Sequence, residues 1–404
     1  MLDSIYIGLT GLTSYSKDLS VIGDNVANIN TVGYKGQQLL FTDLFYRSQF
    51  GDAGPGAGGD TLELGSGVGT AGTRRIFKQG DLRQTSNDQD VALNGNGFFV
   101  LRRDGQVLFT RAGQFSFDAD GYLVSTAANA RVAALDNGSL HDINIKGAQT
   151  NPGKGTTRAD FAGTLNNTIA ASAPFTVSGV QVFDSTGVLH TWSVVFTNNA
   201  SVTNGSWLVT VNENNAAVAS GEIRFDASGT PSAGFNQLQV PLLANSAGAS
   251  SVTLNFGDPG SISGARSLSA SASDLHLSAQ DGFAVGSLTK ASFDASGQLV
   301  ATYSNGQTVK LDRLALASFN FLQGLRPLEG SLFAAGVDEA PTFGHAGEAA
   351  FGSVSADQVE LANVDLAQEF SDLIVTQRGY QASSQVITTA NEMIQQLYDM
   401  KARR

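Results

Sequence analysis

The chain of 404 residues contains no cysteine, few prolines and no run of apolar residues long enough to cross a bilayer. Without cysteine, disulfides, thiol nucleophiles and cysteine-ligated metal sites are excluded. A membrane-spanning helix needs about 20 consecutive apolar residues, so none is expected. The first residues, MLDSIYIGLTGLTSYS, have neither the basic segment nor the long apolar core of a cleaved signal peptide. If the protein leaves the cell, we expect another route of export.

Charged residues are also scarce. They make up 15% of the chain, against about 25% in an average soluble domain. The net charge is −12 and no basic stripe is present, so the chain has no electrostatic source for binding a phosphate backbone, and nucleic acid is not expected as a partner. Apolar residues reach 42% and glycine 46 residues. That composition is typical of packed cores built from short strands and tight turns.

Motifs for catalysis or cofactor binding are weak. Two segments match G-x-G-x-x-G, but neither shows the preceding strand and following helix of a dinucleotide site; they are Gly54/Gly56/Gly59 and Gly67/Gly69/Gly72. The four histidines lack metal-ligand spacing. The fragment FDADG lacks the further ligands of a calcium loop. A glycosidase-like carboxylate pair is neither shown nor excluded. We expect no catalytic residue, no cofactor and no metal.

Both ends of the chain are predicted to be helical, because apolar residues recur there every three or four positions. Over residues 2–29 the apolar face comprises Leu2, Ile5, Leu9, Leu12, Leu19, Ile22 and Val26. Near the C-terminus it comprises Leu366, Phe370, Leu373, Tyr380, Ile387, Ile394 and Tyr398. Asn363 or Asp365 is expected to cap the second helix. The first helix is marginal alone, since Gly8, Gly11 and Gly23 each weaken it by about 1 kcal/mol relative to alanine.

We interpret these two apolar faces as an assembly interface. The common alternative is that such a face packs inside its own domain. Here the faces lie at opposite ends of the chain, and the residues between them are predicted to form self-sufficient β domains. Burying one Leu or Phe side chain contributes about 1.5–3 kcal/mol. The two faces are therefore expected to contact each other and copies of themselves on neighbouring molecules.

The middle of the chain alternates polar and apolar residues between glycine turns, a pattern typical of short strands. One turn phrase occurs four times, as FDADGYLV, VFDSTGVLH, FDASGTP and FDASGQLV. In each phrase Asp starts the turn and Gly takes the left-handed position of a hairpin. Four hairpins of one design predict an all-β middle.

Composition changes suggest the domain boundaries. The glycine-rich residues 51–72 are expected to be a long loop or extended arm, and loop-like stretches near residues 147 and 284 mark the edges of an inserted domain. We predict a helical terminal domain at 1–30 and 360–404, a connecting segment at 31–75, a first β domain at 76–145 and 285–358, and a second, inserted β domain at 146–284.

The two ends carry specific paired motifs. After the first helix come Asn-x-x-Asn and Gly-Tyr-Lys, which are Asn25, Asn28, Gly33, Tyr34 and Lys35. The second helix opens with Asn-Val-Asp-Leu and continues through Gln377, Arg378, Tyr380 and Gln381 to Thr-Thr at 388–389. Residues 90–124, DVALNGNGFFVLRRDGQVLFTRAGQFSFDADGYLV, carry a third pattern. Together these segments resemble the termini and first β domain of the bacterial flagellar rod and hook axial proteins.

The resemblance implies a fold that is mainly β with α-helical termini. The N- and C-terminal helices would pair as a coiled coil in an inner domain, with two nested β domains formed by the middle of the chain. Rod subunits of this family are shorter, whereas a chain with a second, inserted β domain is similar to hook subunits. The implied function is a structural subunit that self-assembles into a curved helical tube, a universal joint that transmits motor torque from rod to filament.

The same resemblance implies export through the flagellar apparatus and an extracellular place in the hook and basal body. The implied partners are copies of the chain and the rod, hook-cap and hook–filament junction proteins, with no enzyme activity, no nucleic acid and no membrane insertion. Two alternatives remain: a straight distal-rod-like protein, and an extracellular β-rich adhesin or hydrolase. The chain departs from the family pattern at Gly379, where a helix former is more usual, and we interpret this glycine as a point of local flexibility.

Overall fold

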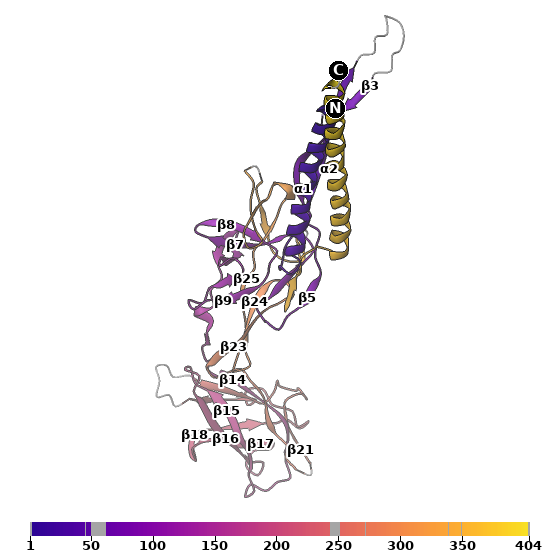
Figure 1. Cartoon of the computed structure of the whole chain (residues 1–404). Helices are drawn as coiled ribbons and strands as arrows, with labels where there is room; N and C mark the ends of the chain where they lie inside the picture. Colours follow the sequence, from indigo (N-terminus) through magenta and orange to yellow (C-terminus); the bar gives the residue numbers. More distant parts are fainter. Residues whose placement is uncertain are drawn as a thin grey trace, which may run out of the picture. The chain divides into compact units, whose positions relative to one another are not determined.

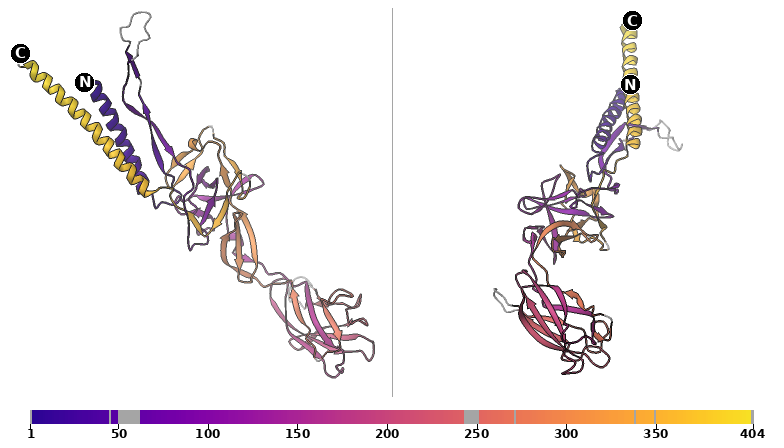
Figure 2. Two further views of the ribbon diagram at one scale, coloured as in Figure 1. Left: turned by 90° about the vertical axis from the view of Figure 1, so that its right-hand side faces the viewer. Right: turned by 90° about the horizontal axis from the view of Figure 1, so that it is seen from below.

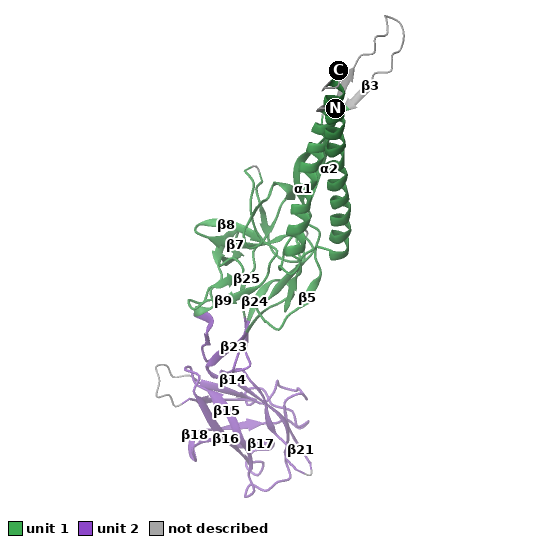
Figure 3. Ribbon diagram, viewed as in Figure 1, with its two compact units in different colours: residues 1–146, 291–300, 310–404 green, residues 147–290, 301–309 purple. Residues whose placement is uncertain are grey.

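The computed structural model describes residues 2–44, 46–49, 62–242, 251–270, 272–337, 339–348 and 350–402. The fold is mainly β with one long helix at each end of the chain (Figure 1), as the sequence predicts. Two compact units are present (Figure 3), one of residues 1–146, 291–300 and 310–404, the other of residues 147–290 and 301–309. The coiled-coil pairing and the nested domain boundaries given by the sequence stay predictions.

The two helices lie side by side in unit 1. Helix α1 spans Leu2–Ala27 and helix α2 spans Leu366–Ala402, and all views show them along one another (Figures 1 and 2). Asp365 caps α2, because its Oδ1 accepts hydrogen bonds from the backbone N–H of Ala367 at 2.8 Å and Gln368 at 3.3 Å. Asn363, the other candidate cap, has a different role described below.

A two-stranded arm follows α1. Strand β1 (Gln37–Asp43) pairs antiparallel with β4 (Val68–Arg75), and β2 (Tyr46–Gln49) pairs with β3 (Leu62–Gly65). The predicted loop at 51–72 thus lies in part on β3 and β4, while residues 51–61 lie outside those described. The arm contacts α1 through the backbone of Val68, which accepts a hydrogen bond from Ser14 and donates one to Thr10.

The β part of unit 1 is built around a ten-stranded sheet with a branched strand order. Its core holds edge-on phenylalanine pairs, such as Phe109 with Phe319 at 4.8 Å between ring centroids. The strands are β7 (Phe98–Arg103), β8 (Gln106–Thr110), β9 (Phe115–Phe117), β10 (Leu123–Ser125), β11 (Arg131–Asp136), β12 (Ser139–Asp142), β26 (Leu316–Ser318), β27 (Arg326–Leu328), β28 (Leu332–Ala334) and β29 (Thr342–Gly344).

Two short strand pairs connect the C-terminal part of the chain to the start of this β domain. Strand β5 (Leu82–Gln84) pairs with β31 (Gln358–Glu360), and β6 (Val91–Asn94) pairs with β30 (Ser353–Ala356). The last two strands of the β domain, β30 and β31, therefore pair with two of its first strands, β6 and β5. A further four-stranded sheet has the order β13-β23-β24-β25, and its strands hold residues assigned to both units. These strands are Thr150–Asn151, Gly286–Phe293, Gln298–Tyr303 and Thr308–Arg313. Short 3₁₀ turns lie at Lys146–Ala148 and Leu322–Gly324.

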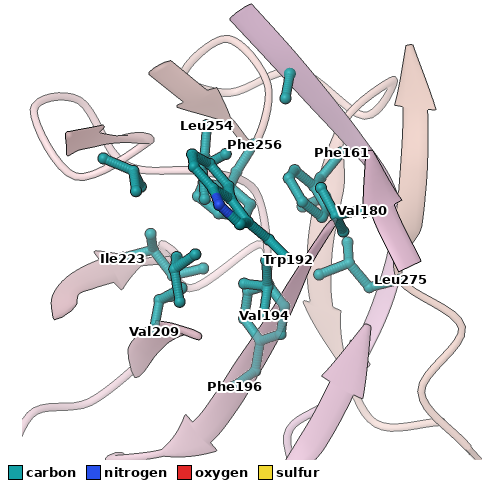
Figure 4. Packing of buried hydrophobic residues seen from close by; sticks show 14 of the residues in the cluster. Phe161, Val180, Trp192, Val194, Phe196, Val209, Ile223, Leu254, Phe256 and Leu275 are labelled. Carbon is teal, nitrogen blue, oxygen red and sulfur yellow. The ribbon is translucent and has the colours of Figure 1, made fainter. Parts of the chain in front are cut away.

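Unit 2 packs two sheets around one aromatic core (Figure 4). Trp192 and Phe196 of one sheet pack in the same cluster as Phe161 of the other sheet and Phe256, which directly follows β20. Trp207 belongs to the same cluster. The first sheet is antiparallel and holds β15 (Phe175–Phe183), β16 (Leu189–Asn198), β17 (Ser206–Glu213) and β18 (Ala216–Arg224). The second holds β14 (Arg158–Asn166), β19 (Gln237–Pro241), β20 (Ser251–Asn255), β21 (Ala265–Leu268) and β22 (His276–Gln280).

The four recurring turns have the predicted construction. In each, the leading aspartate accepts hydrogen bonds from backbone N–H groups two and four residues ahead, and the glycine has a positive φ between 74° and 84°. The aspartates are Asp118, Asp184, Asp226 and Asp294. The hairpin interpretation of FDADG is therefore confirmed.

Asp281 holds the entry of the chain into unit 2. Its carboxylate accepts hydrogen bonds from the backbone N–H of Thr157 at 2.8 Å and Arg158 at 3.0 Å, and from the Thr157 hydroxyl at 2.6 Å. Burial raises the pKa of Asp281, but these hydrogen bonds and one from Lys154 outweigh it and lower the pKa to about 2. The ionised carboxylate thus ties the start of β14 to the end of β22.

Candidate assembly interface

The seam between α1 and α2 is lined by small residues. A Cβ atom added at Gly8 would lie 2.7 Å from Cγ1 of Ile387, and one at Gly11 would lie 2.7 Å from Oγ of Ser383. Real Cβ atoms do not make contacts this short, so Gly8 is needed for the observed approach of the helices, while a Cβ at Gly11 requires the Ser383 hydroxyl to rotate away. The glycines that weaken α1 as an isolated helix are therefore the residues that let α2 pack closely against it.

Gly379 has a packing role as well. Helix α2 runs unbroken through it, and a Cβ there would lie 2.6–2.9 Å from three carbons of the Tyr15 ring. The same ring packs on Phe41 of the arm, with 5.7 Å between centroids. The interpretation of Gly379 as a point of flexibility is thus replaced: its missing side chain is the space that Tyr15 fills.

The predicted apolar faces are only partly covered. Ile22 is buried, and Ile5, Leu12, Leu19, Val26, Leu373, Ile387 and Ile394 are half-buried. Five members are exposed: Leu9 (52%), Leu366 (41%), Phe370 (53%), Tyr380 (36%) and Tyr398 (70%). The side chain of Leu2 lies outside those described. Other exposed apolar residues that the sequence analysis did not select are Tyr6, Ile7, Ile374, Val375, Val386, Met393, Leu397 and Met400.

On α2 all but one of the exposed large apolar residues form two groups, and the exception, Ile374, lies opposite the seam. An α-helix turns about 100° per residue, which places the groups on either side of the seam with α1. The first shoulder comprises Leu366, Phe370, Tyr380 and Tyr398, and the second shoulder comprises Val375, Val386, Met393, Leu397 and Met400. A polar strip lies opposite the seam, at Ser371, Arg378, Gln385, Glu392 and Gln396. Each helix pair therefore presents two separate apolar surfaces to solvent.

Both helices are anchored at one place, which we call the helix root and define as residues 33–37, 76–80 and 360–363. Asn25, near the end of α1, donates from Nδ2 to the carbonyl of Gln37 at 2.8 Å, and its Oδ1 accepts from the Gln37 N–H at 2.9 Å. The same Nδ2 donates to Glu369 in the first turn of α2 at 3.0 Å. One amide thus joins both helices to the segment that leaves α1.

Asn363 and Asn28 complete these amide contacts. Oδ1 of Asn363 accepts from the Gly36 N–H at 2.8 Å, and its Nδ2 donates to the carbonyls of Ile76 at 2.6 Å and Lys78 at 2.8 Å. Asn28 donates back to Asp24 of α1. The asparagine-rich stretch of the sequence is explained by this root, where amide side chains satisfy backbone groups at the end of α1, at the start of β1 and in the irregular segments between elements.

Gly33 and Tyr34 fix the exit from α1. Gly33 has a φ of 69°, and a Cβ there would lie 2.5 Å from the backbone nitrogen of Ala112, so only glycine fits. Burial, followed by the hydrogen bond to Asp24, raises the pKa of Tyr34 to about 12. Its hydroxyl therefore remains protonated and donates to Asp24 at 3.0 Å.

A buried ion cluster lies at the centre of the root. Lys35 and Glu360 are both fully buried and their Nζ and Oε1 atoms are 2.5 Å apart. Nη1 of Arg111 is 3.3 Å from the other carboxylate oxygen of Glu360. Burial lowers the pKa of Lys35 and of Arg111, and the charge of Glu360 opposes the shift in both. The Gly80 N–H also donates to Glu360, at 2.9 Å.

A cavity of about 330 Å³ opens beside the root and belongs to it. Its acidic residue Asp24 accepts hydrogen bonds from Tyr34 and Gln37, and its Arg75 donates to the Lys35 carbonyl. The lining comes from residues 24–37, Arg75 and residues 327–333. Because Asp24, Lys35 and Arg75 in its lining are already paired, the cavity is part of the joint between helices and β domain.

The motif residues predicted from the sequence do not all meet. Asn25, Asn28, Gly33, Tyr34 and Lys35 converge at the root, whereas Gln377, Arg378, Tyr380 and Gln381 lie further along α2. Sequence reasoning missed Glu360 and Arg111. A single glutamate in the apolar run QVELANV, and the arginine of FTRAG, are the signals that could have selected them, because a charge within an apolar strand requires a partner.

Within the described part of the chain, no three His, Cys, Asp or Glu side chains are grouped to hold a metal ion. Among the same residues, neither helix combines the length and the apolar character needed to span a membrane.

Comparison with known proteins yields three family models that match separate segments. Residues 5–35 match the flagella basal body rod protein model, residues 92–151 the flagellar hook protein FlgE/F/G D1 domain, and residues 357–400 the flagellar basal body rod FlgEFG protein C-terminal model. The matched ends contain nearly all of the two helices and half of the root, at residues 33–35 and 360–363. The chain is thus similar to the flagellar rod and hook family at both ends and in its first β domain.

Full-length relatives in this family are named flagellar hook protein FlgE. The one from Borreliella burgdorferi is 29% identical over 442 residues, covering 99% of this chain and 100% of the relative. Those from Salmonella typhimurium and Escherichia coli are each 28% identical, covering 97% of this chain and 98% of the relative. A solved structure of FlgE2 from Helicobacter pylori matches 69% of this chain and 100% of its own at 14% identity, with a TM-score of 0.45.

Proposed function

We propose that this protein is a structural subunit of the bacterial flagellar hook, which self-assembles into a curved helical tube and transmits torque from rod to filament. The similarity to the rod and hook family and the full-length likeness to hook proteins support this assignment. The observation that carries it is the pair of apolar shoulders on α2, which a single chain leaves in solvent.

The placement of the shoulders favours a polymer over a closed pair. The first shoulder and the second shoulder differ in sequence and lie on opposite sides of the seam, so each needs a different partner surface. Contacts of this heterologous kind repeat from one copy to the next and generate a helical assembly when they do not close. Burying one shoulder residue contributes about 1.5–3 kcal/mol, which makes the helices the principal source of assembly energy.

The proposed place of action is the extracellular hook, reached through flagellar export, with the rod, hook-cap and hook–filament junction proteins at its ends. A structural role of this kind requires no catalysis. The distal-rod alternative is not favoured, because the relatives that match this chain from end to end are hook proteins. Electron microscopy of the polymer separates the two, since curved tubes support a hook and straight tubes support a rod.

Substitution of one shoulder residue tests the interface. Val375 is 68% exposed on α2 and Val202 is 79% exposed in unit 2, so Val375→Ser and Val202→Ser remove the same atoms from equally open sites. We expect Val375→Ser to raise the critical concentration for polymerisation by about tenfold, the equivalent of about 1.4 kcal/mol. Val202→Ser should leave it nearly unchanged.

The assay is sedimentation of purified protein over a concentration series, with negative-stain microscopy of the pellets. Circular dichroism of the unassembled variants controls for loss of helix. Equal critical concentrations for Val375→Ser and the unmodified protein would contradict the proposed role of the second shoulder.

A further inference from the structure

The ion cluster at the helix root buries three charged side chains, which the stability of the fold alone does not require. Its three charges come from three distant parts of the chain: Lys35 follows α1, Arg111 lies in the β domain, and Glu360 precedes α2. Side-chain exposures of Lys35, Glu360 and Arg111 are 0%, 0% and 6%. Removing such charges from water has a large penalty, and apolar residues of similar size often stabilise a core as well or better.

The backbone around the cluster is held by the same charges. Lys35 Nζ donates to the Lys78 carbonyl at 2.9 Å, Glu360 accepts from the Gly80 N–H, and the Glu360 carbonyl accepts from the Gly33 N–H at 2.8 Å. Arg111 donates to the Gly95 carbonyl at 2.8 Å. Lys35 and the Glu360 carboxylate therefore fix the irregular backbone at residues 78–80, and Arg111 fixes the turn between β6 and β7.

We propose that Lys35, Arg111 and Glu360 are positioning residues that set the direction in which the helix pair leaves the β domain of unit 1. A buried network of paired charges favours one geometry, whereas apolar side chains in the same space can slide. Both terminal nitrogens of Arg111 have partners in this network, and its Nε is buried without one. The cluster holds the angle between the helix pair and the β domain fixed, so a force applied to the helices is transmitted to the β domain. The role of this fixed angle in transmitting torque rests on the proposed function, whereas the fixed angle itself is a property of the single chain.

Paired spin labels measure this rigidity directly, and the absence of native cysteine allows their placement without background labelling. The reporter pair is Gln385→Cys on α2 with Gln106→Cys in the β domain, and the control pair is Ser139→Cys with Gln106→Cys, both within the β domain. All three sites are exposed. Distances are measured by double electron–electron resonance on the full chain below its assembly concentration.

Two matched carboxylates are compared. Glu360→Gln removes the buried charge between Lys35 and Arg111, and Asp142→Asn removes a carboxylate that Arg102 and Arg131 contact at the surface, at 3.0 and 3.2 Å. We expect Glu360→Gln to make the reporter distribution about twice as wide while the control pair stays sharp. Asp142→Asn should change neither, because exposed ion pairs constrain little.

A third variant keeps the test decisive if Glu360→Gln unfolds the β domain, which a broadened control pair would reveal. Lys35→Met/Arg111→Met/Glu360→Met removes all three charges together and is expected to fold, with a sharp control pair. A broad reporter distribution in this variant supports positioning by the ions. A sharp one overturns the proposal, because apolar packing would then direct the helices equally well. These measurements use the unassembled chain, so their result does not depend on whether the protein polymerises. A failure of the proposed function can therefore be distinguished from a failure of this proposal.

Discussion

Substitution of Gly379 by alanine tests how closely the two helices approach. The added methyl group would lie 2.6 Å from Cζ of Tyr15, and two further ring carbons are within 2.9 Å. A ring cannot bend away as a flexible side chain can, and Phe41 packs against Tyr15 at 5.7 Å. Gly23→Ala on α1 is the matched control, because nothing lies within 4 Å of the Cβ it would add.

Both substitutions gain stability from the higher helix propensity of alanine, but only Gly379→Ala loses stability through overpacking. Alanine in place of a helical glycine stabilises by about 1 kcal/mol, so Gly23→Ala should stabilise by that amount. Overpacking at a close contact costs about 1–3 kcal/mol, so Gly379→Ala should range from neutral to about 2 kcal/mol destabilising. The expected difference between the variants is therefore about 1–3 kcal/mol.

Urea unfolding of the unassembled chain, followed by the helical circular dichroism signal, measures both changes. Adding Tyr15→Ala removes the clash, and in that background Gly379→Ala should regain the stabilisation of about 1 kcal/mol that Gly23→Ala shows. If Gly379→Ala stabilises the unaltered chain as much as Gly23→Ala does, the ring does not occupy the space left by the glycine. Gly379 would then be a point of flexibility after all.

Two further outcomes follow from buried and partly buried charges. Glu360→Gln leaves Lys35 and Arg111 without a counter-charge and should lower the free energy of unfolding by about 3–5 kcal/mol in urea titrations; a change below about 1 kcal/mol, typical of surface pairs, would contradict the burial of this cluster. The folded pKa of Asp281 is lowered to about 2, so its contribution is full above the unfolded value of about 4 and is lost as the pH falls toward 2. After discounting for solvent screening, Asp281→Asn should remove about 1 kcal/mol of this acid-dependent loss, and parallel stability curves for the two proteins between pH 5 and 2 would refute it.

Secondary structure was largely predictable because its signals are local. The 3.6-residue period of the ends, the alternation in the middle and the recurring Asp–Gly turn are each contained in a few residues. Asp365 as the helix cap follows the same logic, since an N-cap acts on N–H groups two and three residues ahead. The motif at Gly33–Lys35 was selected from the family resemblance, and its residues do converge at the root.

The partners of these residues were not predictable, because they depend on contacts over long sequence separations. Lys35 and Arg111 reach Glu360 across 325 and 249 residues of sequence, and nothing near Lys35 in the sequence indicates that it is buried. The orientation of α2 was missed for a related reason. A heptad-like count selects the apolar positions, but the seam is set by the small residues Gly8, Gly11 and Gly379, which a hydrophobic pattern ignores.

The seam and the shoulders divide the work of the terminal helices. Small residues let α1 and α2 approach closely, and only part of the large apolar side chains lies between them. Others, such as Phe370 and Val375, lie at the two sides of the seam, where one chain alone does not cover them. Had the seam used those large residues, the helix pair would be stable alone and its outer faces would be free to become polar. A close seam that includes small residues therefore leaves apolar side chains of the single chain exposed to solvent. The free energy of burying them is then available to contacts between copies.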